Sequence, residues 1–196
     1  GCRIPGNKLA KKLITLFDLP IAAPSANLSE RTSVTNIMDI DPILVKKIFV
    51  LKDKQSSHGL ESTVVRIDTN NEIEVLRYGS ITVEELNKYA KVKIKKKSSI
   101  SPGNLKKHYS TLKPIRMNAK RILKNEGLLN FGNNKLKSKT INLNLSNKKN
   151  LNEAAKNFYH YLHKLDQSRC KKIAVVEIPD KGLGKTINDR LRRAIK

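Results

Sequence analysis

The chain has 196 residues, of which 38% are hydrophobic, and this is enough for one large domain or two small ones with a buried core. It contains no apolar run near the roughly 20 residues that cross a bilayer, and its first residues lack the apolar centre of a signal peptide. Cys2 and Cys170 show no CxxC spacing, which argues against a disulfide framework and against a zinc site. We therefore expect a cytoplasmic protein that does not interact with a membrane.

The formal net charge of +23 is typical of proteins that bind nucleic acid. Most of the basic residues are lysines, and the abundance of lysine, asparagine and isoleucine also reflects A/T-rich codons. Aromatic residues make up only 5% of the chain, so the stacking surfaces of single-strand binders are scarce. The composition predicts general binding to polyanions and gives no support for sequence-specific readout.

The first part of the chain predicts an alternation of helices and strands. Apolar residues recur at helical spacing between Asn7 and Asp18, and a strand is expected at residues 21–23. Residues 35–47 predict a helix broken near Pro42, followed by a strand at residues 48–51. Residues 62–67 and 73–76 predict a β-hairpin. Residues 82–85 match a capping box that begins a short helix, and residues 91–101 form either an edge strand or the start of a linker.

Beyond Pro114 the pattern predicts a second, smaller α/β unit. It consists of an apolar stretch at residues 141–145, a helix over 151–165, a strand over 173–178, a glycine turn at 182–184 and a final helix through Ile195. The turn resembles the tail of a P-loop, but Pro179 stands where the first glycine is required, so a P-loop is rejected. His160 and His163 are three residues apart without a cysteine or carboxylate cluster, and we expect a solvated helix face there and no metal site.

The loop after residues 21–23 carries polar side chains that can bind an oxyanion. Pro20 and Pro24 fix the backbone on either side of the predicted strand. Ser25 and Asn27 then place a hydroxyl and an amide on one side of an extended turn, where they can reach a phosphate or carboxyl oxygen. The structural alternative is a polar turn that closes the strand.

This run, PIAAPSANLS, is accompanied by Arg3-Ile4-Pro5 upstream and by GLESTVV (residues 59–65) and Leu76-Arg77 downstream. Together with SPG at 101–103 and HY at 108–109, these motifs resemble the YrdC-like L-threonylcarbamoyladenylate synthases in their long form. The resemblance implies an α/β fold in which a truncated YrdC-like twisted mixed sheet is followed by a small Rossmann-like domain. It implies a catalytic part at residues 1–90, a linker or flap at 91–114 and a C-terminal domain at 115–196.

The resemblance also implies an activity and a set of site residues. Members of the family form threonylcarbamoyl-AMP and pyrophosphate from ATP, bicarbonate and L-threonine, with Mg2+ accompanying the ATP, and the product feeds a tRNA modification. The motifs assign catalysis to Ser25 and Asn27, ATP binding to Ser25, Ser33, Arg77 and Tyr109, and L-threonine binding to Arg3, Ala23 and Ser62. A guanidinium such as that of Arg77 suits phosphate oxygens.

Each assigned residue also has a purely structural alternative, for example a strand position for Ser62 or a surface arginine at residue 77. The chain opens inside a motif that the family carries in mid-domain, so we expect an incomplete fragment with weak or no activity. The expected partners are tRNA or double-stranded RNA and a downstream threonylcarbamoyl transferase. The alternative function is a non-catalytic basic RNA-binding module.

Overall fold

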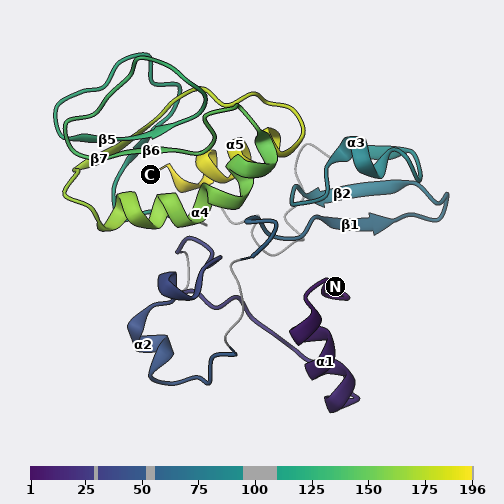
Figure 1. The fold of residues 1–196 in the computed structure, drawn as a ribbon. Coiled ribbons are helices and arrows are strands. Elements are labelled where there is room, and N and C mark those ends of the chain that lie inside the picture. Colours follow the sequence, from purple (N-terminus) through teal and green to yellow (C-terminus); the bar gives the residue numbers. More distant parts are fainter. Residues whose placement is uncertain (29–30, 52–55, 95–109, 196) are drawn as a thin grey trace.

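The computed structural model describes residues 1–28, 31–51, 56–94 and 110–195 (Figure 1). The elements in chain order are α1 (Lys8–Phe17), the 3-10 turn η1 (Ile37–Asp39), α2 (Pro42–Val45), β1 (Val64–Ile67), β2 (Ile73–Arg77), α3 (Val83–Leu86), β3 (Val92–Ile94), β4 (Ile115–Arg116), β5 (Glu126–Asn130), β6 (Asn142–Asn144), α4 (Leu151–Gln167), β7 (Lys172–Val175) and α5 (Leu183–Ala194).

The first sheet contains three strands in the order β1-β2-β3. β1 and β2 form the predicted antiparallel hairpin, with Ile67 opposite Ile73. The Asp68 carboxylate closes its turn by accepting hydrogen bonds from the backbone N–H groups of Asn70 and Glu72, each at 2.9 Å. β3 pairs parallel with β2, so the edge-strand alternative is confirmed for residues 92–94 and the sheet is mixed; the rest of the predicted range, residues 95–101, lies outside the described residues.

The second sheet has the order β4-β7-β5-β6, and every neighbouring pair is parallel. Parallel strands need long crossover connections, and α4 provides the one between β6 and β7. α4 packs against both α5 and β5. This arrangement confirms the small Rossmann-like α/β domain.

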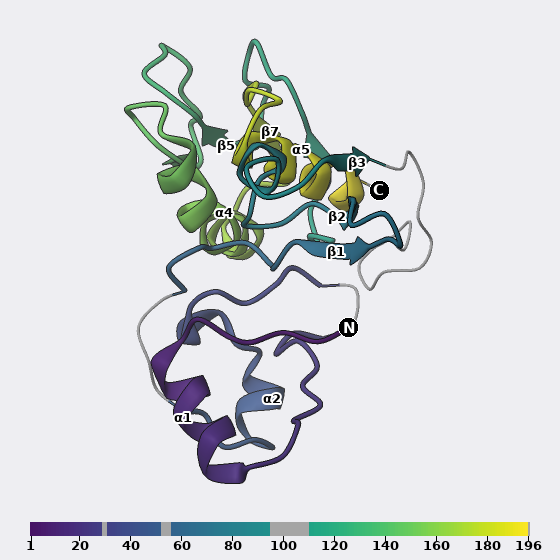
Figure 2. The same ribbon diagram turned by 90° about the vertical axis from the view of Figure 1, so that its right-hand side faces the viewer.

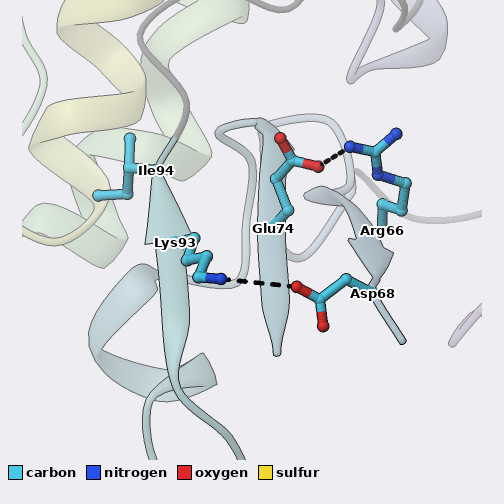
Figure 3. Close-up of a pocket in the computed structure, with 5 residues that line it drawn as sticks. All are labelled: Arg66, Asp68, Glu74, Lys93 and Ile94. Carbon is cyan, nitrogen blue, oxygen red and sulfur yellow. Dashed lines mark ion pairs between the residues drawn. The ribbon is translucent and has the colours of Figure 1, made fainter. Parts of the chain in front are cut away.

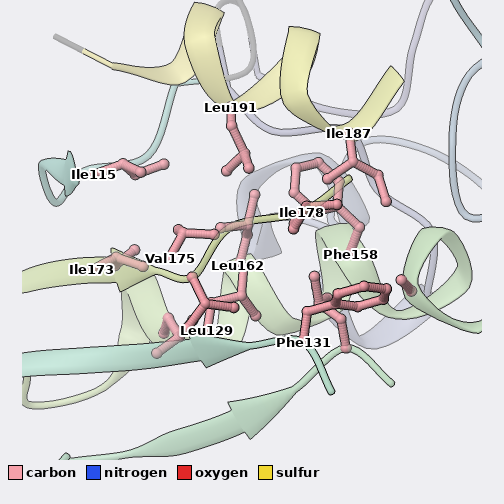
Figure 4. Close-up of a cluster of buried hydrophobic side chains, with 14 of the residues drawn as sticks. Ile115, Leu129, Phe131, Phe158, Leu162, Ile173, Val175, Ile178, Ile187 and Leu191 are labelled. Atoms are coloured by element: carbon pink, nitrogen blue, oxygen red, sulfur yellow. The ribbon is translucent and has the colours of Figure 1, made fainter. Parts of the chain in front are cut away.

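The hydrophobic core lies in this second unit (Figure 4). Buried side chains from α4 and α5 meet those of the sheet, as Phe158, Ile187 and Leu129 illustrate with no exposed surface. The helix predicted over 151–165 is confirmed, and the strand predicted over 173–178 is confirmed as far as Val175, where β7 ends. The central strand β5 is fully buried, and the sequence pattern did not predict it.

Residues 1–51 contain less regular structure than predicted. α1 forms where expected, and Asn7 caps it by accepting a hydrogen bond from the N–H of Ala10 at 2.8 Å, but none of its residues is buried. The strands predicted at 21–23 and 48–51 are wrong, because those residues adopt no strand and Phe49 is 90% exposed. A strand needs a paired neighbour, and Pro20 has no N–H to contribute to one.

The helix predicted over 35–47 is divided as expected near Pro42. η1 precedes Pro42, and α2 begins with it. The side chain of Asn36 caps the N-terminus of η1, and that of Asp41 caps the N-terminus of α2. In Figures 1 and 2, α1 and α2 both lie below β1 and away from the second sheet. α1 and α2 therefore extend from the better-packed remainder of the chain.

Gly59 and Leu60, which precede β1, pack against the second unit. Leu60 is buried and belongs to the core of the second unit. Gly59 has a φ of +66°, and a Cβ there would lie 2.2 Å from the carbonyl oxygen of Ala155. Only glycine allows this backbone to approach α4 so closely. None of the helices in the described ranges is long and apolar enough to cross a membrane.

Candidate functional site

The predicted residues Ser62 and Arg77 meet at the open end of the β1-β2 hairpin. β1 and β2 place Val64 opposite Arg77, so the residues just before β1 lie beside the end of β2. A terminal nitrogen of Arg77 donates to the carbonyl oxygen of Ser62 at 2.9 Å and lies 3.5 Å from its hydroxyl. Both residues are half-buried, and the contact leaves the guanidinium beside a hydroxyl, a combination suited to an anionic ligand.

The chain around this pair is held by close backbone contacts. The N–H of Ser80 donates to the Glu61 carbonyl at 2.8 Å, and Thr63 exchanges two hydrogen bonds with the backbone of Ile81. A Cβ at Gly79 would lie 2.2 Å from the backbone nitrogen of Thr63. Because Gly79 has no side chain, its backbone can lie directly against the backbone of Ser62 and Thr63, next to the Ser62–Arg77 pair.

Ser33, the third predicted residue in this region, reaches the same place through Glu61. The Ser33 hydroxyl donates to one carboxylate oxygen of Glu61, which also accepts from the Tyr159 hydroxyl at 2.7 Å. The other carboxylate oxygen accepts from Nε of Arg190 at 3.0 Å. Residues of both structural units thus contact the carboxylate of Glu61, the residue immediately before Ser62.

The charge of Glu61 is stabilised in this environment. Burial would raise the pKa of Glu61, but the charge of Arg190 and the hydrogen bonds from Ser33 and Tyr159 hold it below its usual value. The Arg190 side chain has no exposed surface, and Asp189 is its second acidic neighbour, at 2.5 Å. Glu61 is therefore ionised at neutral pH and fixed by three donors.

The other predicted residues lie in the exposed N-terminal part. Arg3, Ala23 and Ser25 are exposed. The side-chain amide of Asn27 donates to the carbonyl oxygens of Leu28 and Arg31 at 2.9 and 3.1 Å, as in the polar-turn alternative. The structure thus groups Ser33, Ser62 and Arg77, whereas the convergence of Ser25 and Asn27 on the same surface stays a prediction.

Tyr109, His108 and the SPG motif lie outside the described residues. The next residue, Ser110, forms an isolated parallel bridge with Arg31, two positions before Ser33. The role of Tyr109 in nucleotide binding stays a prediction.

The two histidines of α4 contact residues near Ser33, so the expectation of a solvated helix face is wrong. Nδ1 of His160 lies 2.9 Å from the Asp39 carboxylate. Nε2 of His163 lies 3.2 Å from both the Thr32 hydroxyl and the Ser33 carbonyl oxygen. The reason is that residues 31–39 cross this face of α4 and bury it, which a helical pattern alone does not reveal.

A cavity of about 470 Å³ lies elsewhere on the first sheet (Figure 3). It is lined by Arg66, Asp68, Glu74, Lys93 and Ile94. Arg66 pairs with Glu74, and Lys93 lies 3.7 Å from Asp68, so opposite charges form a row across the three strands. This cavity contains none of the predicted site residues.

Sequence reasoning missed Glu61, Tyr159 and Arg190. Glu61 lies within the GLESTVV motif, but the motif predicted no role for its side chain. A signal for Arg190 was available, because it occupies the apolar face of the last helix together with Ile187, Leu191 and Ala194. An arginine on such a face needs a buried acidic partner.

Comparisons with known proteins cover nearly the whole chain. Residues 81–195 match the family model described as threonylcarbamoyl-AMP synthase, C-terminal domain, and residues 1–79 match the model described as telomere recombination. Threonylcarbamoyl-AMP synthases of Pyrococcus abyssi and Bacillus subtilis are 26% and 28% identical to 98% of this chain, which spans 62% of the length of each. The crystal structure of P. abyssi Sua5 in complex with L-threonine is similar with a TM-score of 0.83 and 25% identity, over 98% of this chain and 62% of that one.

Proposed function

Because the chain belongs to the threonylcarbamoyl-AMP synthase family, we propose that it carries part of a site that makes threonylcarbamoyl-AMP and pyrophosphate from ATP, bicarbonate and L-threonine. The relatives bear that enzyme name, and one of them is known with L-threonine bound. The product would be used by a downstream threonylcarbamoyl transferase that acts on tRNA.

The contact between Arg77 and Ser62 is the observation that carries this proposal. Arg77 would meet the phosphates of ATP, since a planar guanidinium binds two phosphate oxygens at once. Ser62 would hold L-threonine beside it, and the 2.9 Å contact keeps the two binding elements adjacent. Adenylation needs these two substrates next to each other, because the carboxylated amino acid attacks the α-phosphate.

The remaining assigned residues complete this proposed site. Ser25 and Asn27 would contact the reacting groups, Ser33 and Tyr109 the nucleotide, and Arg3 and Ala23 the amino acid. Within the described ranges, no group of three histidine, cysteine or acidic side chains could hold a metal. Mg2+ would bind with the ATP, through its phosphates, as is common for this ion.

We further propose that another polypeptide segment, from the same or a second chain, covers the surface of residues 1–51. That stretch exposes large apolar side chains, including Leu16 at 75%, Met38 at 82% and Phe49 at 90%. Surfaces of this kind mark interaction sites or aggregation-prone regions. Residues 1–196 alone would then have weak or no activity.

The net charge of +23 favours a second candidate, a basic module that binds tRNA or double-stranded RNA without catalysis. Titration of tRNA binding with salt tests it, because purely electrostatic binding weakens steeply as salt rises and is indifferent to sequence. Such a module would have no reason to bind L-threonine.

Calorimetric titration of the chain with L-threonine, with and without ATP, tests the first proposal. We expect binding of L-threonine that Ser62→Ala weakens by about tenfold, the loss of roughly one hydrogen bond to a charged ligand. Ser57→Ala is the control, because Ser57 is exposed and outside the site. Equal affinities of the two variants would contradict the assignment of Ser62.

A further inference from the structure

The buried side chain of Arg190 contacts chain segments next to both residues of the proposed site. Its Nε donates to the carboxylate of Glu61, the residue before Ser62, at 3.0 Å. Its terminal nitrogen donates to the carbonyl oxygen of Tyr78, the residue after Arg77, at 2.6 Å. Arg77 in turn donates to Ser62, so these contacts close a ring.

We propose that Arg190 is a positioning residue of the synthase site: acting through Glu61 and Tyr78, it fixes the distance between Ser62 and Arg77. This inference rests on the proposed function. The C-terminal domain thereby contributes to the site without touching a substrate. A guanidinium is suited to this role because its fork holds two acceptors at a set separation, which the single ammonium of a lysine cannot do.

A second contact from α5 supports the same segment. The hydroxyl of Thr186, one helical turn before Arg190, donates to the carbonyl oxygen of Gly79 at 3.0 Å, and both residues are buried. Consecutive carbonyl groups at 78 and 79 are therefore held by α5. The end of β2, from which Arg77 projects, is fixed to the C-terminal domain at two adjacent positions.

Glu61 also determines how Ser33 can bind a ligand. The single hydroxyl hydrogen of Ser33 is directed at the carboxylate of Glu61. The hydroxyl oxygen can then only accept a hydrogen bond from a substrate. In the proposed site Ser33 would accept from a donor of ATP, such as a ribose hydroxyl, and would not donate to a phosphate.

Stability alone does not explain a fully buried arginine at this position. Desolvation of an ion pair is costly, and apolar replacements of buried ion pairs are often neutral or stabilising. Arg190 lies on the apolar face of α5, so a pair of apolar residues at positions 61 and 190 is an arrangement that stability alone would permit. Its polar contacts lead to the residues that flank the site, which points to a role in geometry.

The test compares Arg190→Lys and Arg190→Met with the control Arg116→Met in the full chain. Arg116 pairs with the buried Glu126 within the second sheet, so the control breaks another ion pair of the same domain. Two quantities are measured: the exchange rates of the amide hydrogens of Ser80 and Ile81, which bond to Glu61 and Thr63, and the affinity for L-threonine.

We expect both Arg190 variants to raise exchange at Ser80 and Ile81 by about tenfold or more, through local opening of this segment. L-threonine should bind about tenfold more weakly to both variants, and the control should change neither quantity. Full retention of affinity and slow exchange in Arg190→Lys would overturn the proposal, because charge alone would then suffice. Equal effects in the control would also overturn it, since general destabilisation would explain them.

The two readouts separate this inference from the proposed function. If the unmodified chain does not bind L-threonine, the proposed binding function fails while the exchange rates still decide whether Arg190 fixes the segment. If Arg190→Met does not fold, Arg190→Lys and Glu61→Gln provide the same comparison. Glu61→Gln keeps the shape of the side chain, removes its charge and is expected to raise exchange in the same way.

Discussion

Replacing Glu61 by alanine should destabilise the protein strongly, because the substitution removes a charged acceptor from two buried side chains. Arg190 would keep Asp189 at 2.5 Å but lose its contact with Glu61, and the Tyr159 hydroxyl would lose its acceptor at 2.7 Å. Removing one member of a buried ion pair typically costs about 3–5 kcal/mol. Since Asp189 remains, we expect a loss near the lower limit, about 3 kcal/mol in the free energy of unfolding.

Thermal unfolding followed by circular dichroism measures this loss. For a chain of this size, about 3 kcal/mol corresponds to a decrease of roughly 6–12 °C in Tm. Arg192→Ala is the matched control, because the Asp180–Arg192 pair is more than half exposed on both sides. Such exposed pairs contribute only about 0–1 kcal/mol. A loss in Glu61→Ala no larger than that of the control would refute the role of Glu61 as the acceptor that stabilises the buried side chains of Arg190 and Tyr159.

Three further predictions concern acid stability, chain packing and the flap. The pKa values of Glu61 and Glu126 lie below the ordinary 4.5, so their contribution to stability is complete above pH 4.5 and is lost as pH falls through the folded-state values. Urea unfolding at a series of pH values from neutral to acid should show this loss in the free energy of unfolding. Glu126→Gln should make that free energy depend less steeply on pH, and an unchanged dependence would contradict the prediction. Gly79→Ala should lower Tm by several degrees, because its Cβ would lie 2.2 Å from the backbone nitrogen of Thr63. Gly6→Ala is the control and should leave Tm unchanged, because nothing lies within 4 Å of a Cβ there. Equal Tm values of the two variants would argue against the close packing at Gly79. Tyr109→Ala, made at the matching tyrosine of a complete relative that carries the HY linker, should weaken ATP binding in calorimetry, and unaltered affinity would rule out the flap role.

Local sequence signals predicted those elements whose structure depends on nearby residues. The capping box at Thr82 and Glu85 forms as expected, with both of its reciprocal hydrogen bonds. The hairpin from Val64 to Arg77 likewise follows from its alternating pattern and polar turn. The helix α4 has an apolar face long enough to identify it without knowledge of its neighbours.

The errors occurred where structure depends on distant partners. The segment at 21–23 looks like a strand, but it forms none because no strand in the described part of the chain pairs with it. The strand β5 was missed because its five residues include Gly127, and glycine is rare in strand interiors. Packing favours glycine at position 127, since a Cβ there would lie 2.8 Å from a methyl group of the buried Leu165.

The candidate site could be predicted in part. The motifs predicted that Ser62 and Arg77 belong to one site, and the hairpin register explains why the two residues are in contact. Glu61 and Arg190 are 129 positions apart, and only the packing of α5 against the first sheet brings them together. A single sequence contains no signal for that contact beyond the arginine on an apolar face.

The central claim is that this chain contributes to a threonylcarbamoyl-AMP synthase site. Its most direct test is the release of pyrophosphate that requires ATP, bicarbonate and L-threonine together, measured for the purified chain alone and after adding the N-terminal fragment of a related synthase. We predict little release by either component alone and clear release by the mixture, with Arg77→Gln abolishing the gain. Release by the chain alone near that of an intact synthase would contradict the proposed incompleteness, and no release by a mixture in which the two polypeptides associate would contradict the central claim.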